Sequence, residues 1–264
     1  MSIKCKICGN ESDLLFKHLV RRKYEAEYFK CKSCGFVFIN NPTWLEEAYA
    51  NPINDSDTGI LIRNIVSVDF ISLLIFSYFK KRGEFLDYAG GYGIFTRLMR
   101  DYGFDFYWYD PYTDNIFVKG FEKNITDNVK FEAITAWEFF EHVEDPVQIF
   151  KELLCSTNSI FFSTETISSK YDVNWHYFGY DHGQHISFYE RKTFYKIAEM
   201  FNLNYYYQND FHLLTRKKLN GLFIKMIFLI SKTGFSKVVK KIMKSKTYSD
   251  HEKILKNGSN HENT

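Results

Sequence analysis

The chain has 264 residues, a formal net charge of +2 and a hydrophobic fraction of 45%, which fit one α/β domain with small additions. A pI of about 8.1 lies below the strongly basic range expected of a nucleic-acid-binding domain, so nucleic acid is a disfavoured partner. We find no uninterrupted apolar run of the roughly 18 residues that a membrane span needs. Without a hydrophobic leader, we expect a cytoplasmic protein.

Two matched cysteine pairs stand near the N-terminus, each followed by a glycine: Cys5 and Cys8, then Cys31 and Cys34. Four thiolates in two such pairs suit a tetrahedral zinc site. Two disulfides are the alternative, which a reducing cytosol disfavours. A full set of four cysteine ligands leaves no open position for substrate, so we expect a structural zinc that folds residues 1–40. The fifth cysteine, Cys155, is expected to be buried.

The next two segments lie before the predicted sheet in the sequence. Residues 41–60 are rich in turn-forming residues and predict a loop over a ligand site. Residues 61–82 carry apolar residues at helical spacing and predict a helix that packs on a sheet.

A glycine-rich turn is the strongest signal in the chain. Residues 85–95 read Phe-Leu-Asp-Tyr-Ala-Gly-Gly-Tyr-Gly-Ile-Phe, an apolar strand that leads through an acid and the turn into a helix. A second strand ends at Asp110, where an acid can accept hydrogen bonds from a ribose diol. The pattern predicts an adenosine site. It is not the dinucleotide fingerprint, because Thr96 replaces the last glycine. Ala89 replaces the first glycine, and we expect a negative φ there.

Strands and helices alternate across residues 84–165, which predicts a parallel sheet with right-handed crossovers. Strands are expected at residues 131–136 and 159–165, with a helix between them that ends near residue 154. A last core helix at residues 192–202 and a closing antiparallel strand pair at residues 203–215 complete the predicted domain.

Three histidines and several aromatic residues lie within residues 174–189, a segment expected at the carboxyl edge of the sheet, where α/β folds bind ligands. Histidine suits a general base, because its unperturbed pKa is roughly 6.5. We expect His185 to be the base, with His182 and Glu141 as further catalytic candidates. The opposing interpretation of each histidine, including His176, is a structural hydrogen-bonding residue.

The C-terminal tail is basic. Between Phe211 and Ser249 there are ten Lys and Arg residues and no acid, which predicts one or two basic amphipathic helices. Residues 216–246 either rest on an anionic membrane surface or pack against the domain or a second copy in a homodimer. Residues from about 251 to 264 are expected to be disordered.

The glycine turn, Asp-Tyr-Ala-Gly-Gly-Tyr-Gly, resembles motif I of class I S-adenosylmethionine-dependent methyltransferases. A downstream pattern of these enzymes is matched at Glu138, Glu141, His142, Asp145 and Pro146. Residues 183–189, together with the four cysteines, resemble a group of bacterial methyltransferases. That group includes sugar C-methyltransferases that act on nucleotide-linked deoxysugars with a histidine base.

The resemblance implies an α/β fold with a Rossmann-like, seven-stranded sheet and helices on both faces. We divide the chain into a zinc ribbon (1–40), a methyltransferase domain (41–215) and a basic helical tail (216–264). S-adenosylmethionine is the implied cofactor. Asp110 is assigned to its ribose, Trp137 and Glu138 flank it, and Arg63 is assigned to its carboxylate or to an anionic substrate group. The methionine end is assigned to the glycine turn: Asp87, Ala89, Gly90, Gly91, Tyr92 and Gly93.

Three functions remain open from the sequence. The first is methylation of a small acceptor, such as a sugar, a nucleotide-linked sugar or a small phosphorylated precursor, in cell-surface polysaccharide biosynthesis. The second is an RNA or protein methyltransferase that grips its substrate with the ribbon. The third is a non-catalytic scaffold that binds the cofactor.

Overall fold

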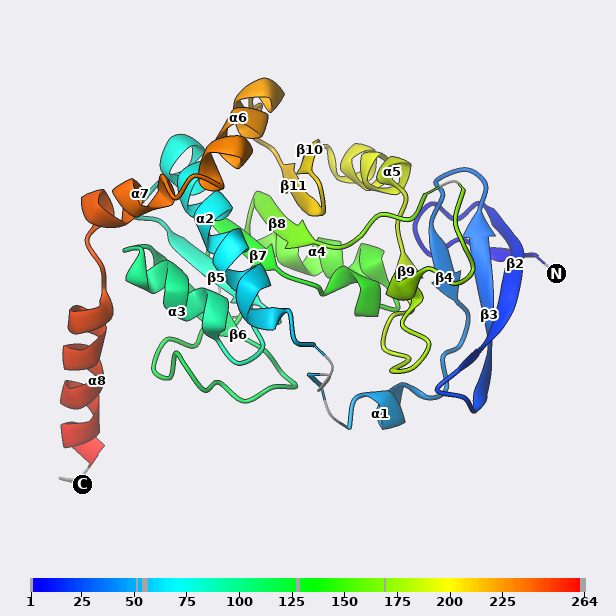
Figure 1. Cartoon of the computed structure of the whole chain (residues 1–264), viewed down its shortest axis with the longest axis horizontal. Helices are drawn as coiled ribbons and strands as arrows, with labels where there is room; N and C mark the ends of the chain where they lie inside the picture. Colours follow the sequence, from blue (N-terminus) through cyan, green and yellow to red (C-terminus); the bar gives the residue numbers. More distant parts are fainter. Residues whose placement is uncertain (1, 51, 54–56, 127–128, 169, 262–264) are drawn as a thin grey trace. The chain divides into compact units, whose positions relative to one another are not determined.

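The computed structural model describes residues 2–50, 52–53, 57–126, 129–168 and 170–261. It forms two compact units (Figure 1). Unit 1 comprises residues 1–55 and 136–218, and unit 2 comprises residues 56–135 and 219–264. Each unit is therefore built from two separate stretches of the chain.

Unit 1 contains an antiparallel sheet of five strands. Its strands lie in the order β1 (Ser2–Lys4), β2 (Glu11–Val20), β3 (Tyr24–Cys31), β4 (Val37–Ile39) and β9 (Ser187–Phe188). Unit 1 also holds β8 (Ser159–Ser163) and the antiparallel strands β10 (Asn204–Gln208) and β11 (Phe211–Thr215). Its helices are α1 (Leu45–Ala48), η1 (Phe140–His142), α4 (Pro146–Ser156), η2 (His176–Phe178) and α5 (Arg191–Phe201).

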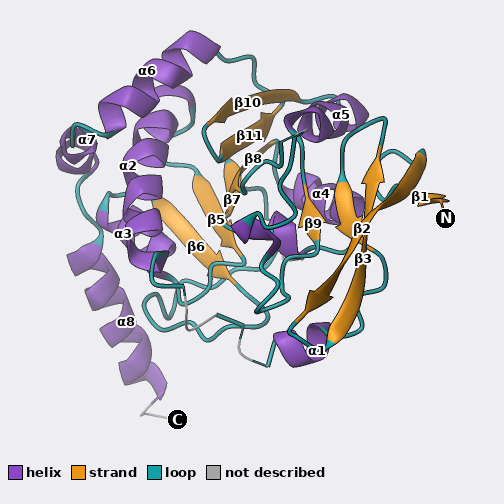
Figure 2. Ribbon diagram, turned by 45° about the vertical axis from the view of Figure 1, so that its right-hand side comes forward, coloured by secondary structure: helices purple, strands orange, loops and turns teal. Residues whose placement is uncertain are grey.

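Unit 2 contains parallel strands, seen side by side in Figure 2. They are β6 (Asp105–Tyr109), β5 (Glu84–Tyr88) and β7 (Ala133–Ala136), whose last residue already belongs to unit 1. The helices of unit 2 are α2 (Ile60–Tyr78), α3 (Ile94–Asp101), α6 (Gly221–Ser231), α7 (Ser236–Met243) and α8 (Thr247–His261). Burial of residues 85–88 of β5 explains the continuous apolar character of that strand.

The sequence predicts seven strands in the main sheet, whereas six are found among the described residues, in the order β10-β11-β8-β7-β5-β6. Beyond β6, the sheet continues only as an isolated parallel bridge between Trp108 and Glu122. Two backbone bonds flank this bridge: Trp108 N–H donates to Phe121 O and Lys123 N–H donates to Trp108 O. The expected seventh strand is thus reduced to one residue pair.

Most predicted elements are present with shifts of a few residues. Helix α2 matches the helix predicted at 61–82, α5 matches the last core helix, and β10 and β11 form the closing pair. The expected loop at 41–60 contains the short helix α1, while residues 51 and 54–56 lie outside the described residues.

Two expectations, for the C-terminal residues and for Cys155, are wrong. Residues 251–261 are helical rather than disordered, and 262–264 lie outside the described residues. Cys155 is exposed, not buried. Helix α2 is long and apolar enough to cross a membrane by length and composition, although Arg63 and Asp69 interrupt its apolar run. Much of its C-terminal half is buried in unit 2, as in a core helix.

Candidate functional site

The glycine turn of unit 2 connects β5 to α3. Gly91 and Gly93 have φ of 52° and 85°, a region that glycine enters without strain. Gly90 is confined by neighbours, since a Cβ there would lie 2.7 Å from Trp108 Cδ1. Trp108 Nε1 donates to Gly91 O over 2.9 Å, and Tyr92 O accepts from the N–H groups of residues 116 and 117. Hydrogen bonds from Trp108 and from residues 116 and 117 therefore hold the turn in place.

Asp87 lies near the end of β5, just before this turn. It is 1% exposed, and its two carboxyl oxygens accept from Thr135 Oγ1 (2.8 Å) and Thr96 Oγ1 (2.9 Å). Burial raises the pKa of Asp87 to about 7, against these two hydrogen bonds, which lower it. The threonine that breaks the dinucleotide fingerprint thus has a defined partner.

Asp110 follows β6 and organises the adjoining loop. Its Oδ2 accepts from Gly91 N–H (2.9 Å), and its Oδ1 accepts from Tyr112 N–H (2.8 Å) and Thr113 N–H (3.0 Å). These bonds occupy three of the roughly four acceptor positions of a carboxylate. Burial raises the pKa of Asp110. Asp110 therefore lies beside the glycine turn, and its contact with a ribose stays a prediction.

Ala89 and Arg63 of unit 2 are also assigned to the cofactor. Ala89 has φ of 55°, so the expected negative φ is wrong: the strand ends in a left-handed residue although alanine stands there. Arg63 lies on α2 and forms an ion pair with Asp57 (2.5 Å). Its contact with the cofactor stays a prediction.

Trp137 and Glu138 follow β7 in unit 1. Glu138 has φ of 46°. Its N–H donates to Ser163 Oγ (2.9 Å), and Ser163 Oγ donates to Glu138 Oε1 (2.5 Å). The ring of Trp137 packs edge-to-face on Phe211 at 5.9 Å. These bonds hold Glu138 at the carboxyl end of β8.

A buried polar cluster surrounds Glu141. This side chain is 0% exposed, and Tyr177 Oη donates to its Oε1 over 2.6 Å. Tyr177 Oη also lies 3.2 Å from Thr164 Oγ1. Among the described residues, Oε2 of Glu141 has no hydrogen-bond partner. Burial, reinforced by Glu138, raises the pKa of Glu141 well above its ordinary value, which favours a neutral carboxylic acid.

Two histidines lie against this acid. Each Nδ1 is bonded to a backbone carbonyl: His142 to Gln184 O (3.1 Å) and His185 to Tyr177 O (2.6 Å). In the neutral ring, Nδ1 is then the donor and Nε2 carries the lone pair. Burial lowers the pKa of His142 to about 4 and that of His185 well below 6.5. One ligand atom from each of Glu141, His142 and His185 lies within 4.8 Å of the others.

The other two histidines of the segment differ. Nδ1 of His182 accepts from Gln184 N–H (3.1 Å), so its neutral ring presents Nε2–H, a donor rather than a base. Its ring lies over Gly179 and 4.7 Å from His185. His176 is exposed and pairs with Glu165 (3.2 Å).

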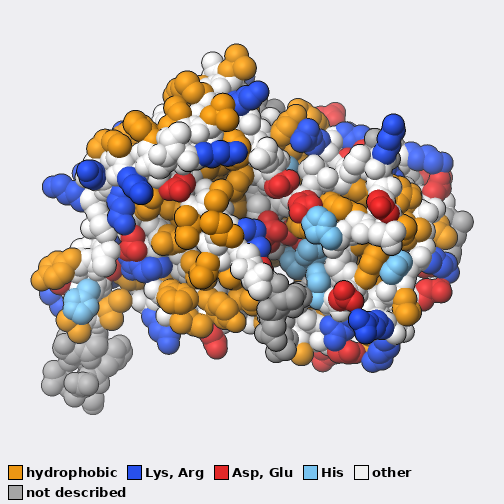
Figure 3. Space-filling model, in the orientation of Figure 1, with side chains coloured by type: hydrophobic (Ala, Val, Ile, Leu, Met, Phe, Trp, Pro, Cys, Tyr) orange, Lys and Arg blue, Asp and Glu red, His pale blue; other side chains and the backbone are white. Residues whose placement is uncertain are grey.

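The histidine segment is held by the N-terminal strands of the same unit. Strand β9 pairs with β4, and Trp44 Nε1 donates to Gly183 O over 2.7 Å. Arg21 Nη1 donates to His182 O over 3.1 Å. Figure 3 shows histidine and acidic side chains together on the surface of this region. Hydrogen bonds therefore join the histidine segment to the cysteine-containing sheet within unit 1.

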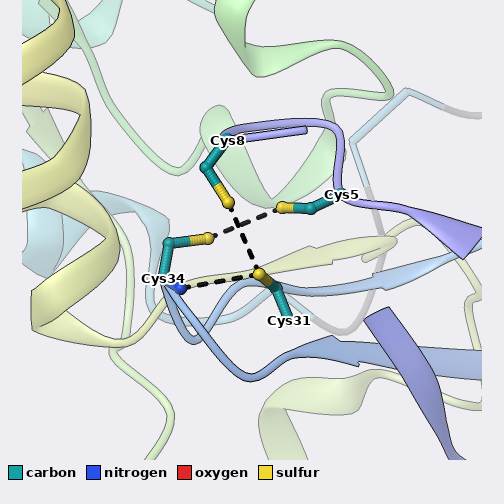
Figure 4. A group of neighbouring side chains, drawn as sticks. All are labelled: Cys5, Cys8, Cys31 and Cys34. Atoms are coloured by element: carbon teal, nitrogen blue, oxygen red, sulfur yellow. Dashed lines mark hydrogen bonds between the residues drawn. The ribbon is translucent and has the colours of Figure 1, made fainter. Parts of the chain in front are cut away.

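The four cysteines converge, as predicted from their spacing (Figure 4). Sγ–Sγ distances are 3.5 Å for Cys5 and Cys34 and 3.5 Å for Cys8 and Cys31, too long for disulfides. Zn–S bonds of about 2.3 Å give sulfur separations of about 3.8 Å in a tetrahedron. Backbone N–H groups of Ile7 and Cys34 donate to two of the sulfurs, as thiolates require. The arrangement fits a structural zinc site.

The basic residues of the ribbon are largely neutralised. Lys17 pairs with Glu25 and Glu27, while Arg21 and Lys23 pair with Glu47. This leaves little positive charge for a phosphate backbone.

Sequence reasoning missed Tyr177 and Thr164, which complete the environment of Glu141. Tyr177 lies inside the histidine segment, but nothing in the sequence distinguishes it from the other aromatic residues there. Thr164 directly follows the buried strand β8, and no sequence pattern marks it.

The family comparison matches residues 66–208, more than half of the chain, to a methyltransferase domain. The chain belongs to this family, and it is an S-adenosylmethionine-dependent methyltransferase. The matched region includes the glycine turn, Asp110 and the cluster around Glu141. Curated protein sequences include no match to this chain.

Several solved structures match the chain at low sequence identity. They include CalO1, a methyltransferase of calicheamicin biosynthesis (10% identity, TM-score 0.41), where the match covers 58% of this chain and 54% of CalO1. Magnesium protoporphyrin IX methyltransferase from Synechocystis PCC 6803 matches with 11% identity, TM-score 0.46, and coverage of 67% and 96%. The plantazolicin methyltransferase BpumL matches with 12% identity, TM-score 0.45, and coverage of 67% and 95%.

Proposed function

We propose that this enzyme methylates a small polar acceptor in the cytoplasm, either a sugar, a nucleotide-linked sugar or a small phosphorylated precursor, in cell-surface polysaccharide biosynthesis. The observation that carries the proposal is the polar cluster of buried Glu141 and Tyr177 with partly buried His142 and His185. A hydroxylated acceptor needs such donors and acceptors in a site shielded from water. The polysaccharide context rests on the resemblance of residues 183–189 and the cysteines to bacterial sugar methyltransferases.

The cofactor is assigned to the residues around the glycine turn. The backbone of residues 90–93 allows the cofactor to approach closely. Asp110 accepts hydrogen bonds from the ribose, and Asp87 stabilises the turn through its own hydrogen bonds. Bound there, S-adenosylmethionine supplies an electrophilic methyl group. The chain itself must orient the acceptor and remove its proton, and orientation alone can contribute several kcal/mol to the lowering of the barrier.

His185 is the residue we assign as base. Tyr177 O fixes its tautomer, so Nε2 can accept a proton from an acceptor hydroxyl. Its lowered pKa keeps the ring neutral at physiological pH. Glu141 and His182 play a different role in this arrangement. Both present donors, the neutral carboxylic acid through Oε2 and the imidazole through Nε2–H, and so position the acceptor.

We also propose that the four cysteines bind one structural zinc. This zinc folds the sheet to which the histidine segment is attached, and takes no part in methyl transfer.

The test is methyl transfer by the purified enzyme to free sugars, nucleotide-linked sugars and sugar phosphates, combined with a structure bound to S-adenosylhomocysteine. With a reactive acceptor in hand, His185→Ala should lower turnover by about 10²–10⁴ while leaving the affinity for S-adenosylhomocysteine nearly unchanged. Because the pKa of His185 is lowered, the activity of the native enzyme should fall only well below pH 6.5.

His176→Ala is the matched control, because His176 belongs to the same segment but is exposed. Its turnover should stay near that of the native enzyme. Near-normal turnover of His185→Ala on the true acceptor would show that His185 is structural. Transfer to RNA or protein but to no small acceptor would reject the proposed substrate class.

A further inference from the structure

Helix α6 in unit 2 is apolar on two opposite sides. Its N-cap is Asn220, whose side chain accepts from Leu222 N–H and Phe223 N–H. One side is buried through Ile224, Ile227 and Phe228, and Phe228 contacts Phe70 of α2 with ring centroids 5.1 Å apart. This side explains how the helix packs.

The opposite side of α6 is uncovered. Leu222, Met226 and Leu229 recur at intervals of four and three residues, so they form one stripe. Leu222 is 81% exposed. A helix that is apolar all round is normally enclosed on all sides, in a large core or in lipid. Packing on α2 therefore accounts for only half of the apolar character of α6.

Helix α7, the next helix of the chain, carries a second exposed apolar group. Val238 and Ile242 form an exposed apolar pair at i and i+4, beside the lysine pair Lys237 and Lys241. Phe235, just before the helix, is also exposed. On the face drawn in Figure 3, hydrophobic side chains gather over α6 and lysines over α7.

The charge of this surface has one sign. Residues 219–249 contain seven lysines and no acid. Six of them are exposed: Lys225, Lys232, Lys237, Lys240, Lys241 and Lys244. Among the described residues, none of these six pairs with a carboxylate, whereas Lys246 pairs with Asp105. In the ribbon of unit 1, glutamates neutralise the basic residues, whereas the described residues provide no carboxylate partner for these six lysines.

We propose that α6 and α7 form a docking surface for an anionic lipid bilayer. The exposed leucine and methionine side chains of α6, together with Phe235 before α7, would enter the headgroup and acyl boundary. Lysines on both helices would meet the anionic headgroups, with their alkyl stems along the apolar surface. A bilayer accounts for both features together, since a hydrophobic protein partner leaves six unpaired lysines unexplained.

Co-sedimentation of the full chain with vesicles tests this surface. Vesicles of equal parts phosphatidylcholine and phosphatidylglycerol should bind the protein, vesicles of phosphatidylcholine alone should bind it poorly, and added salt should weaken binding. Lys237→Ala with Lys241→Ala should weaken binding by about tenfold or more. Leu222→Ser with Leu229→Ser should weaken it by a similar factor.

Two control variants change the same residue types elsewhere on the surface: Lys151→Ala and Leu19→Ser. Both should bind like the native chain, and thermal melting establishes that every variant folds. Equal binding to neutral and anionic vesicles, or none to either, would overturn the proposal. A dimer in solution that Leu222→Ser with Leu229→Ser dissociates would assign the surface to a second copy instead.

Discussion

Ala89 and Glu138 adopt left-handed backbone conformations, with φ of 55° and 46°. For a residue with a Cβ, this conformation costs roughly 1–2 kcal/mol. Such strain persists where the surroundings require a particular backbone path, and it concentrates at functional sites. Ala89 directly follows β5, and Glu138 is the second residue after β7; both lie in segments assigned to the cofactor. The sequence showed that Ala89 replaces a glycine, but not that the glycine conformation is retained.

Replacing Ala89 by glycine should therefore stabilise the protein. Relief of the left-handed strain exceeds the entropy that glycine adds to the unfolded chain, so the free energy of unfolding should rise by about 1 kcal/mol. Denaturant unfolding measures this change. Ala48→Gly is the control, because Ala48 lies in α1, where the same substitution should destabilise by about 0.5–1 kcal/mol. A lower free energy of unfolding for Ala89→Gly than for the native chain would contradict the inferred backbone strain at Ala89.

Asp110 connects the glycine turn to the loop after β6, and the same carboxylate is assigned to the ribose. Asp110→Ala should weaken binding of S-adenosylhomocysteine by about tenfold or more, because a charged acceptor is lost and the loop loses its backbone partners. Calorimetry measures the affinity. Asp114→Ala, at an exposed position in the same loop, should leave the affinity unchanged. Equal affinities of the two variants would reject the assignment.

At the scale of elements, patterns within a few residues were sufficient for most of the fold. Apolar strands, the glycine turn and helical spacing located α2, β5 and α5. The order of α8 was missed because it depends on a distant contact. Asp250 is buried and forms ion pairs with Arg97 and Arg100 of α3, at 2.8 and 2.6 Å. The residues next to Asp250 in the sequence give no indication of these ion pairs.

Strand β11 carries a buried histidine whose titration affects stability. Tyr205 Oη lies 2.7 Å from His212 Nδ1, and His212 Nε2 lies 3.0 Å from Thr164 O. Burial, with Arg191 as a minor contribution, lowers the pKa of His212 to about 4. Between pH 6.5 and about 4, the unfolded state binds more protons at this position. Its contribution to stability is therefore present above pH 6.5 and is lost as pH falls through this window.

His212→Gln should remove this pH dependence. Between pH 7 and 4, the free energy of unfolding of the native chain should fall by about 3 kcal/mol more than that of the variant, as a shift of about 2.5 pKa units implies. Chemical unfolding at several pH values measures both curves. The exposed control His251→Gln should follow the native curve. Parallel curves for His212→Gln and the native chain would contradict the lowered pKa.

At the scale of the whole molecule, the cysteine-containing sheet and the histidine segment belong to one unit. The cysteine spacing alone indicated where sulfurs would meet, because a CxxC pair is a local feature. That β4 would pair with β9 could not be read from the sequence, because β9 has only two residues and lies far along the chain. We therefore expect the order of the cysteine site to affect the segment that carries the proposed base.

Metal analysis should accordingly return one zinc per chain, and Cys31→Ser should remove it, because zinc binding and folding are coupled in such sites. Hydrogen exchange should then become faster in residues 2–39 and in β9, while β5 and β6 of unit 2 stay protected. Cys155→Ser is the matched control, since Cys155 is exposed and lies outside the cluster; it should keep both the metal and the protection. Protein prepared without chelator that contains no metal would rule out the site. Loss of metal from Cys31→Ser without faster exchange in β9 would show that the histidine segment folds independently of the zinc.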